Sequence, residues 1–145
     1  MLETVPFGGK FVDGCHQLVV RVYYADTDLS GVVYHGRYLE FFERGRTEYL
    51  RLSGIHHRKI IEGDGLAWVV RRMDIEFHNA AHIDDILIVE SRVVHVTGAR
   101  IKMEQIIIRD TKLLTKARVE VAVVNGEGRP RRFPDVWRDK FIVKS

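Results

Sequence analysis

The sequence predicts an α+β protein in which an antiparallel sheet packs against one long helix. Three observations support this fold class: an apolar stripe at helical spacing covers residues 35–52, four segments with strand character follow it, and short turn signals separate those segments. Because short turns join neighbouring strands in antiparallel order, the sequence of elements favours one helix packed on one antiparallel sheet.

The N-terminal part predicts an irregular leader and then a first strand. Residues 1–15 contain several glycines and show no clear alternation of apolar and polar positions. Residues 17–24, QLVVRVYY, are rich in β-branched and aromatic side chains, which are typical of a strand. Residues 26–33 carry Asp, Thr, Ser and Gly, so we expect a loop there.

The predicted helix over residues 35–52 has one apolar face. That face consists of Tyr38, Phe41, Phe42, Gly45, Tyr49 and Leu52, while Glu43, Arg44, Arg46, Glu48 and Arg51 fall mostly outside it. Ser53 and Gly54 supply a stop signal. An interior glycine costs about 0.5–1 kcal/mol relative to alanine. Gly45 therefore indicates either that a sheet packs closely on the helix or that the position simply tolerates glycine.

The rest of the chain predicts a short connection, four strands and a closing helix. Residues 56–65 form the connection, and residues 134–141 are expected to form the short helix. The four strands are expected at residues 66–78, 85–96, 100–109 and 113–124. We see no repeat, linker or low-complexity segment, so we expect one domain spanning residues 1–145.

Composition and charge exclude several classes of protein. The chain has 145 residues, 46% of them hydrophobic and 30% charged, which is ordinary for a soluble domain. No apolar run approaches the ~20 residues of a membrane span. Cys15 is the only cysteine, so no internal disulfide forms and we expect a cytoplasmic protein. The net charge of +3 is spread over small clusters, which favours a small phosphorylated ligand over a nucleic acid.

The loop before the long helix carries the clearest candidate chemistry. A helix N-terminus exposes unpaired N–H groups with a partial positive charge, which can hold an oxyanion. Asp28 lies just before these groups and could attack a polarised carbonyl or activate water, and Tyr34 and His35 lie at the helix start. The same residues also have a non-catalytic explanation, in which the aspartate only caps its own loop and the histidine is a polar surface residue.

Other candidate sites are weaker. His78, His82, Asp84 and Asp85 lie near one turn, but they complete no metal-ligand pattern, so we predict no metal. The chain has no Gly-x-Ser-x-Gly segment and no phosphate-binding glycine loop.

Three segments of the chain resemble the hotdog-fold acyl-CoA thioesterases. They are residues 20–50 (VRVYYADTDLSGVVYHGRYLEFFERGRTEYL), 68–77 (WVVRRMDIEF) and 81–87 (AHIDDIL). The likeness covers nearly the whole chain after residue 17 and is strongest to the branch encoded with the bacterial Tol-Pal envelope system, which is related to 4-hydroxybenzoyl-CoA thioesterase. The resemblance implies a hotdog fold, with the sheet wrapped around the central helix, and a homodimer or homotetramer whose sheets join edge to edge.

The resemblance also implies roles for individual residues. The family's catalytic aspartate falls on Asp28, and the helix-start N–H that polarises the thioester carbonyl falls on His35. Tyr34 lines the same entrance. Because active sites in the family lie at the dimer interface, Asp28 would face a strand start on the partner. The facing residues would be Ala67, Trp68 and Val69.

The implied reaction is hydrolysis of an acyl-CoA thioester to a free acid and coenzyme A, with Asp28 as nucleophile or as general base. Coenzyme A is then part of the substrate, and no cofactor is predicted. Its phosphates need cations, for which Arg100, Arg131 and Arg132 are candidates, unless each is only a solvated surface arginine. Gly36, where relatives often have a larger residue, bears on acyl-chain preference.

Three alternatives stay open at this stage. The first is a non-catalytic module that binds acyl-CoA or acyl carrier protein and is linked to envelope maintenance, since a fold does not fix a function. The second is a hotdog hydratase or dehydratase, but its different His/Asp arrangement on the helix is not found here. The third is a structural partner of envelope proteins. The acyl chain and the thiol carrier are equally open.

Overall fold

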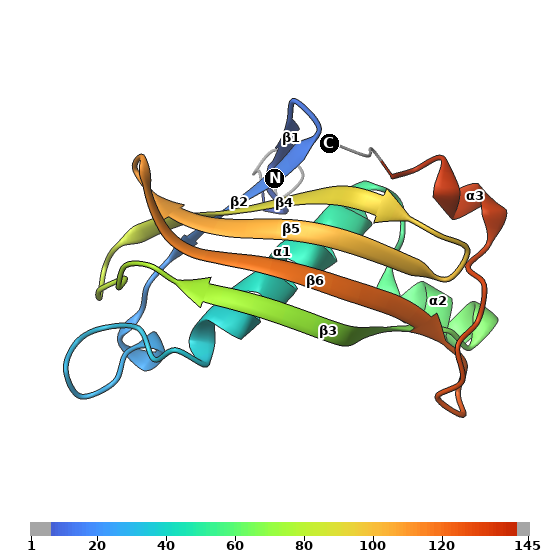
Figure 1. The fold of residues 1–145 in the computed structure, drawn as a ribbon, viewed down its shortest axis with the longest axis horizontal. Coiled ribbons are helices and arrows are strands. Elements are labelled where there is room, and N and C mark those ends of the chain that lie inside the picture. Colours follow the sequence, from blue (N-terminus) through green and yellow to red (C-terminus); the bar gives the residue numbers. More distant parts are fainter. Residues whose placement is uncertain (1–6, 142–145) are drawn as a thin grey trace.

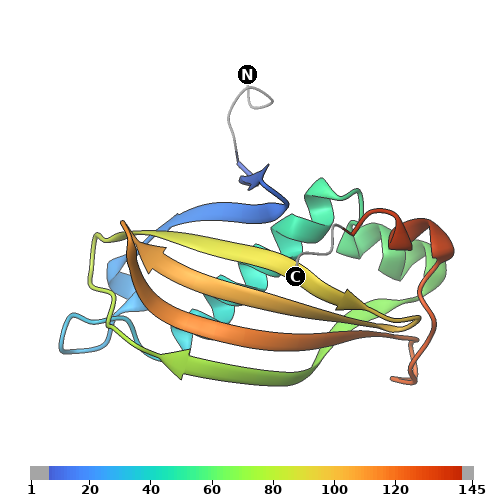
Figure 2. The same ribbon diagram turned by 45° about the horizontal axis from the view of Figure 1, so that its top comes forward.

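A computed structural model describes residues 7–141 of the chain, apart from the side chains of residues 57, 59 and 64. Its elements are β1 (Lys10–Val12), β2 (Cys15–Arg21), a short 3₁₀-helix (Tyr24–Asp26), α1 (Arg37–Leu52), α2 (His57–Asp64), β3 (Ala67–Phe77), β4 (Ile86–Val96), β5 (Arg100–Arg109), β6 (Lys112–Val124) and α3 (Asp135–Arg138). The strands form one antiparallel sheet in the order β1-β2-β4-β5-β6-β3, and α1 lies along one face of it (Figures 1 and 2). The α+β class predicted from the sequence is confirmed.

The N-terminal elements differ from the prediction at two places. Part of the leader is not irregular: Lys10–Val12 forms β1, which pairs with the start of β2. Asp13 and Gly14 form the tight turn between them, with φ of 52° and 80°, as a two-residue hairpin turn requires. The strand predicted over residues 17–24 is β2, and it ends at Arg21, because the chain forms the 3₁₀-helix from Tyr24 onward. Residues 1–6 lie outside the described part of the chain.

The core lies between α1 and the inner face of the sheet. The helix buries Tyr38, Phe41, Phe42 and Tyr49 against alternate residues of β4, β5 and β6. Leu52, expected on this face, is 47% exposed because it lies at the helix end. The apolar face otherwise follows the predicted stripe.

Gly45 marks the place where α1 packs most closely on the sheet. A Cβ at this position would lie 2.8 Å from Val89 Cγ1 and 2.9 Å from Ser91 Oγ, both on β4. These distances are too short for a real side chain. Of the two interpretations of this glycine, close packing of the sheet on the helix is the one that the structure supports, and β4 side chains make the approach.

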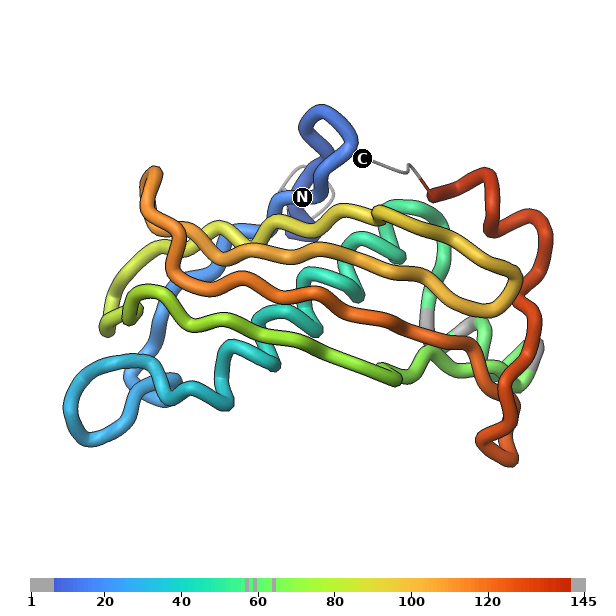
Figure 3. The backbone as a smooth tube through the Cα atoms, viewed as in Figure 1, coloured from blue at the N-terminus to red at the C-terminus, as the bar shows by residue number. Residues whose placement is uncertain are grey.

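β3 is an edge strand that runs the length of the sheet. It pairs with β6 on one side, and no described strand pairs with its other side. Its last residues lie at the same end of the sheet as the 26–36 loop, and its first residues lie at the opposite end, near the β4–β5 turn and the chain that follows β6 (Figures 1 and 3). This arrangement sets the positions of all the candidate site residues.

Candidate active site

Asp26 and Asp28 have different surroundings although they are two residues apart. Asp26 is buried, and its carboxylate accepts the Tyr23 N–H at 2.8 Å and lies 3.4 Å from Arg37 Nε. Its backbone carbonyl accepts the Tyr34 N–H at 3.0 Å. Asp26 therefore fastens the loop to the start of α1, and it is not exposed for chemistry.

Asp28 is exposed at the tip of the same loop. Its Oδ1 accepts two hydrogen bonds from Ser30, from the N–H at 2.8 Å and from the hydroxyl at 2.6 Å. Both bonds lower the pKa of Asp28, so the carboxylate is ionised at neutral pH. The loop-capping geometry expected for such an aspartate is present. It occupies one carboxylate oxygen and keeps the side chain charged and exposed.

The residues just before α1 offer free hydrogen-bond donors. His35 and Gly36 form a turn, closed by the Arg37 N–H donating to the Tyr34 carbonyl at 2.8 Å, so α1 begins two residues later than predicted. Within residues 7–141, no acceptor pairs with the backbone N–H of His35 or Gly36. These N–H groups lie at the positive end of a 16-residue helix, which suits them to an oxyanion.

Aromatic rings surround these N–H groups. The Tyr34 and His35 rings lie 4.6 Å apart between centroids, and the His35 ring lies 6.3 Å from that of Phe77, the last residue of β3. A Cβ on Gly36 would lie 2.6 Å from Tyr34 Cε2, so the Tyr34 ring covers this glycine. Tyr34 is nonetheless 53% exposed, so its ring is accessible to a ligand that approaches this turn.

The residues expected to face Asp28 from a partner lie far from it within one chain. Ala67, Trp68 and Val69 begin β3, whereas Phe77 ends it beside His35. At about 3.3 Å per residue, Trp68 and Phe77 are separated by about 30 Å. The structure therefore keeps the two groups of candidate residues at opposite ends of the strand.

The three candidate arginines gather at the Trp68 end of the sheet. Arg100 follows the β4–β5 turn and pairs with Glu120 at 3.8 Å. The Arg131 N–H donates to the Val123 carbonyl, and the Arg132 guanidinium lies against Gly98 in the turn. The structure thus brings Arg100, Arg131 and Arg132 to the same end as Ala67–Val69.

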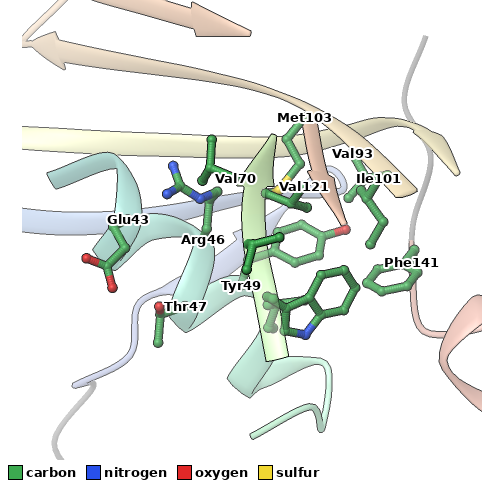
Figure 4. Close-up of a pocket in the computed structure, with 13 residues that line it drawn as sticks. Glu43, Arg46, Thr47, Tyr49, Val70, Val93, Ile101, Met103, Val121 and Phe141 are labelled. Carbon is green, nitrogen blue, oxygen red and sulfur yellow. The ribbon is translucent and has the colours of Figure 1, made fainter. Parts of the chain in front are cut away.

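A cavity of about 250 Å³ lies between the second half of α1 and β3 (Figure 4). Its walls are mainly apolar and include Trp68 and Val69 together with Val93, Ile101, Met103, Val121 and Phe141. Trp68 stacks on Trp137 of α3, with ring centroids 5.6 Å apart, and this cluster closes the far end. The sequence did not reveal the cavity, because its walls come from five separate elements and the C-terminal segment.

Arg46 is the functional candidate that the sequence missed. It was expected outside the apolar face, but it is only 9% exposed and lines the cavity. The signal was in its spacing: Arg46 lies four residues after Phe42 and three before Tyr49, on the face that both of them share.

The turn around His82 does not form a metal site. The Asp85 carboxylate instead accepts the His82 N–H at 2.8 Å and pairs with Arg109 at 2.7 Å. Among the side chains that the structure describes, no group of three from His, Cys, Asp or Glu is placed to hold a metal. In the described part of the chain, no helix is long and apolar enough to cross a membrane.

Residues 30–116 match the protein family described as the thioesterase superfamily. The chain belongs to the thioesterase superfamily. It is 48% identical to the acyl-CoA thioesterase YbgC of Haemophilus influenzae over 90% of this chain and 96% of that protein. It is 38% identical to the acyl-CoA thioester hydrolase YbgC of Escherichia coli O6:H1 over 79% of this chain and 87% of that one.

Solved structures of the superfamily agree with this assignment. A probable thioesterase from Bartonella henselae is 50% identical, with a TM-score of 0.80 over 83% of this chain and 99% of that one. A 4-hydroxybenzoyl-CoA thioesterase is only 16% identical but has a TM-score of 0.82 over 88% of this chain and 98% of that one, which shows the shared fold. The family and the hotdog fold predicted from the sequence are therefore confirmed.

Proposed function

We propose that this superfamily member hydrolyses acyl-CoA thioesters to free acids and coenzyme A. One observation carries the proposal: an exposed, ionised carboxylate, Asp28, lies in the loop that leads to the unpaired N–H groups of His35 and Gly36. A nucleophile or base beside an oxyanion site is what acyl transfer needs. Similarity to an acyl-CoA thioesterase over nine tenths of the chain supports the same reaction.

In the proposed mechanism the thioester carbonyl oxygen accepts the N–H of His35. Attack by the Asp28 carboxylate forms a C–O bond and breaks the C–S bond, and the thiolate leaves and takes a proton from solvent. Water then cleaves the resulting anhydride and restores the carboxylate. The alternative is that the Asp28 carboxylate acts as general base and activates the attacking water; the lowered pKa keeps the carboxylate ionised for either role.

Labelled water distinguishes the two routes. In ¹⁸O-water, the nucleophilic route labels the Asp28 carboxylate when water attacks the Asp28 carbon of the anhydride, and labels the released acid when water attacks the acyl carbon. Label in the Asp28 peptide after repeated turnovers, detected by mass spectrometry, would therefore establish attack by Asp28. The general-base route puts label only in the released acid, so a peptide that stays unlabelled leaves general-base catalysis or water attack on the acyl carbon as the two explanations.

The complete site is proposed to need two copies of the chain. β3 has an open edge, and a two-fold axis pairs such an edge with its own copy in antiparallel order. The start of one β3 then lies beside the end of the other. Phe77 contacts the His35 ring at the end, and Trp68 lines the cavity at the start, so pairing brings Asp28 of one protomer to the cavity of its partner.

The same pairing gives the arginines a role. Arg100, Arg131 and Arg132 lie at the cavity end, where they would approach a coenzyme A molecule whose thioester is held at Asp28 of the other protomer. Their guanidinium groups suit its phosphates. Tyr34 covers the turn at the entrance, and its exposed ring is free to pack on the substrate.

The test is thiol release from a panel of short, long and aromatic acyl-CoA esters by wild type and Asp28→Asn. We expect a loss of about a thousandfold or more in Asp28→Asn with the circular dichroism unchanged. Asp110→Asn is the matched control, since Asp110 is an exposed turn aspartate with φ of 57° that asparagine tolerates. Equal activity of wild type and Asp28→Asn would remove Asp28 from the mechanism. Bound coenzyme A without any hydrolysis would favour a binding module.

A further inference from the structure

Arg46 places a guanidinium group in the wall of a mainly apolar cavity, which the polar side chains of Glu43 and Thr47 also line (Figure 4). Its Nη1 donates to Gln105 Oε1 at 3.1 Å, and this is its one hydrogen bond to the described residues. Gln105 is itself held in place, because its Nε2 donates to the Phe42 carbonyl at 2.9 Å and to Ser91 Oγ at 2.8 Å. The network therefore fixes Arg46 on the cavity side of α1.

The guanidinium group has donors to spare. Arginine carries five N–H donors, and one is used here. No carboxylate of the described residues forms an ion pair with Arg46. Glu43 acts on it only at longer range, and burial lowers the pKa of Arg46. The remaining Arg46 N–H groups are not among the fully buried donors that lack a partner, so an acceptor that enters the cavity can reach them.

A second buried donor lines the same cavity. The indole N–H of Trp68 is buried and has no hydrogen-bond partner among the described residues. Buried polar groups are nearly always hydrogen-bonded, so the unpaired Trp68 N–H and the accessible Arg46 N–H groups together suit an occupant that carries acceptors. The volume, about 250 Å³, is below the roughly 300–1,000 Å³ of a pocket for a drug-sized ligand, which suits a short acyl group and not a whole coenzyme A ester.

We propose that Arg46 selects the acyl group, by donating hydrogen bonds to an oxygen carried on the acyl chain away from the thioester. The substrates are then short acyl-CoA esters whose chains bear a carboxylate or hydroxyl oxygen, in preference to plain alkyl chains. This inference rests on the proposed function: the thioester reacts at Asp28 and His35 of one protomer, and its acyl group enters the cavity of the partner. Arg46 then acts on specificity and takes no part in bond cleavage.

The competing explanation is that Arg46 only ties α1 to β5 through Gln105. The two explanations differ in what the loss of Arg46 changes. A structural tie affects all substrates alike, because it acts on the position of the helix. A recognition role changes the ratio between substrates that differ only in the distal oxygen, which isolates the hydrogen bond from the rest of the site.

The experiment compares kcat/KM for hexanoyl-CoA, 6-hydroxyhexanoyl-CoA and adipoyl-CoA, which have equal chain lengths. We expect wild type to prefer an oxygenated ester by about ten- to hundredfold, as for a hydrogen bond to a charged group. Arg46→Met, which keeps the length but removes the donors, should bring the ratio close to one. The matched control is Arg44→Met, an exposed arginine on the same helix that does not line the cavity, and it should keep the wild-type ratio.

The two oxygenated esters identify the acceptor. A preference for adipoyl-CoA assigns a carboxylate, and a preference for 6-hydroxyhexanoyl-CoA assigns a hydroxyl group. The proposal is overturned if wild type shows no preference, or if Arg46→Met lowers all three rates alike. Should Arg46→Met fail to fold, Arg46→Leu also removes every side-chain donor, and an unchanged ratio in that variant would overturn the proposal equally.

Failure of the underlying function gives a different result. If Asp28→Asn is as active as wild type, the proposed mechanism fails whatever the substrate ratio. If no ester is hydrolysed, calorimetric affinities of the same three esters for wild type and Arg46→Met replace the rates. A lost affinity ratio would then support acyl recognition by Arg46 in a binding module, and an unchanged ratio would overturn it.

Discussion

The two ends of β3 carry different and complementary chemistry. The end at Phe77 adjoins His35 and its unpaired N–H group, and the loop that leads to His35 carries the exposed, ionised carboxylate of Asp28. The end at Trp68 adjoins a mainly apolar cavity with the cation of Arg46 in its wall. In the proposed function, the first end supplies the groups that react with a thioester, and the second supplies the space and the cations that bind one.

This difference indicates why the edge of β3 stays open. The strand has 11 residues and is too long and stiff to bring its own ends together. In the proposed dimer, a second copy in antiparallel order would supply each end with what it lacks, and the two-fold symmetry would do so twice. The free edge is then part of the proposed catalytic unit, and its cost as an exposed strand is removed by pairing.

The largest effect is expected when the two ends are inactivated on separate chains. Asp28→Asn removes the carboxylate, and Val121→Phe fills the cavity from β6 without changing the β3 edge. Each variant alone should lose about a thousandfold in activity. Co-expressed at equal levels, they should recover about a quarter of the wild-type activity, because random pairing leaves one site in four intact.

The control for this recovery is a single chain that carries both substitutions. Co-expressed with either single variant, it forms no site with an intact carboxylate and an intact cavity, so activity should stay near zero. If the co-expressed single variants form a mixed dimer but recover no activity, each protomer works alone. Light scattering during chromatography gives the oligomeric state of each preparation, and a monomer with full activity would contradict the arrangement.

A smaller effect is expected from the arginines at the cavity end. Replacing Arg100, Arg131 and Arg132 together by alanine should raise KM for coenzyme A esters by about tenfold with little change in kcat, since each exposed contact to a phosphate contributes about 0.2–1 kcal/mol. The effect should shrink at high salt. The control substrate is an N-acetylcysteamine thioester, which has no phosphates, and an equal rise of its KM would assign the residues to the fold.

The close packing of α1 on β4 at Gly45 bears on the cavity end of β3, because it sets the position of the neighbouring Arg46. Gly45→Ala adds a Cβ that meets Val89 and Ser91 at under 3 Å, and overpacking of this kind costs about 1–3 kcal/mol. Urea denaturation should show this loss. Gly63→Ala in α2 is the control: no atom lies within 4 Å of its Cβ, so it should gain about 0.5–1 kcal/mol. A loss of unfolding free energy in both Gly45→Ala and Gly63→Ala would contradict the packing argument.

Local sequence patterns predicted most of the fold. They predicted less of the site, because the site depends on contacts between residues that are far apart in the sequence. The apolar stripe gave α1, because burial repeats with the helical period, and alternation gave β4 to β6. The Asp13-Gly14 signal for the β1–β2 hairpin was present in the sequence but is only two residues long. The burial of Arg46 could not be predicted from its charge, since it depends on Gln105, which is 59 residues away in the sequence.

The smallest expected effect concerns the pKa of Asp28. Hydrogen bonds from Ser30 are its largest cause of lowering, so Ser30→Ala, which removes the hydroxyl and keeps the N–H, should raise this pKa part of the way toward the usual value of an aspartate. The sign follows from linkage: a lowered folded-state pKa favours folding above the unfolded pKa, and that contribution disappears as the pH falls through the folded pKa. Carboxyl-carbon NMR titration of Asp28 measures the shift. Activity at neutral pH should stay nearly unchanged, because the carboxylate is ionised in both proteins. If the pKa of Asp28 is the same in Ser30→Ala as in wild type, the backbone N–H donors of the loop alone lower it. The Ser30 hydroxyl would then have no part in keeping Asp28 ionised for its proposed chemistry.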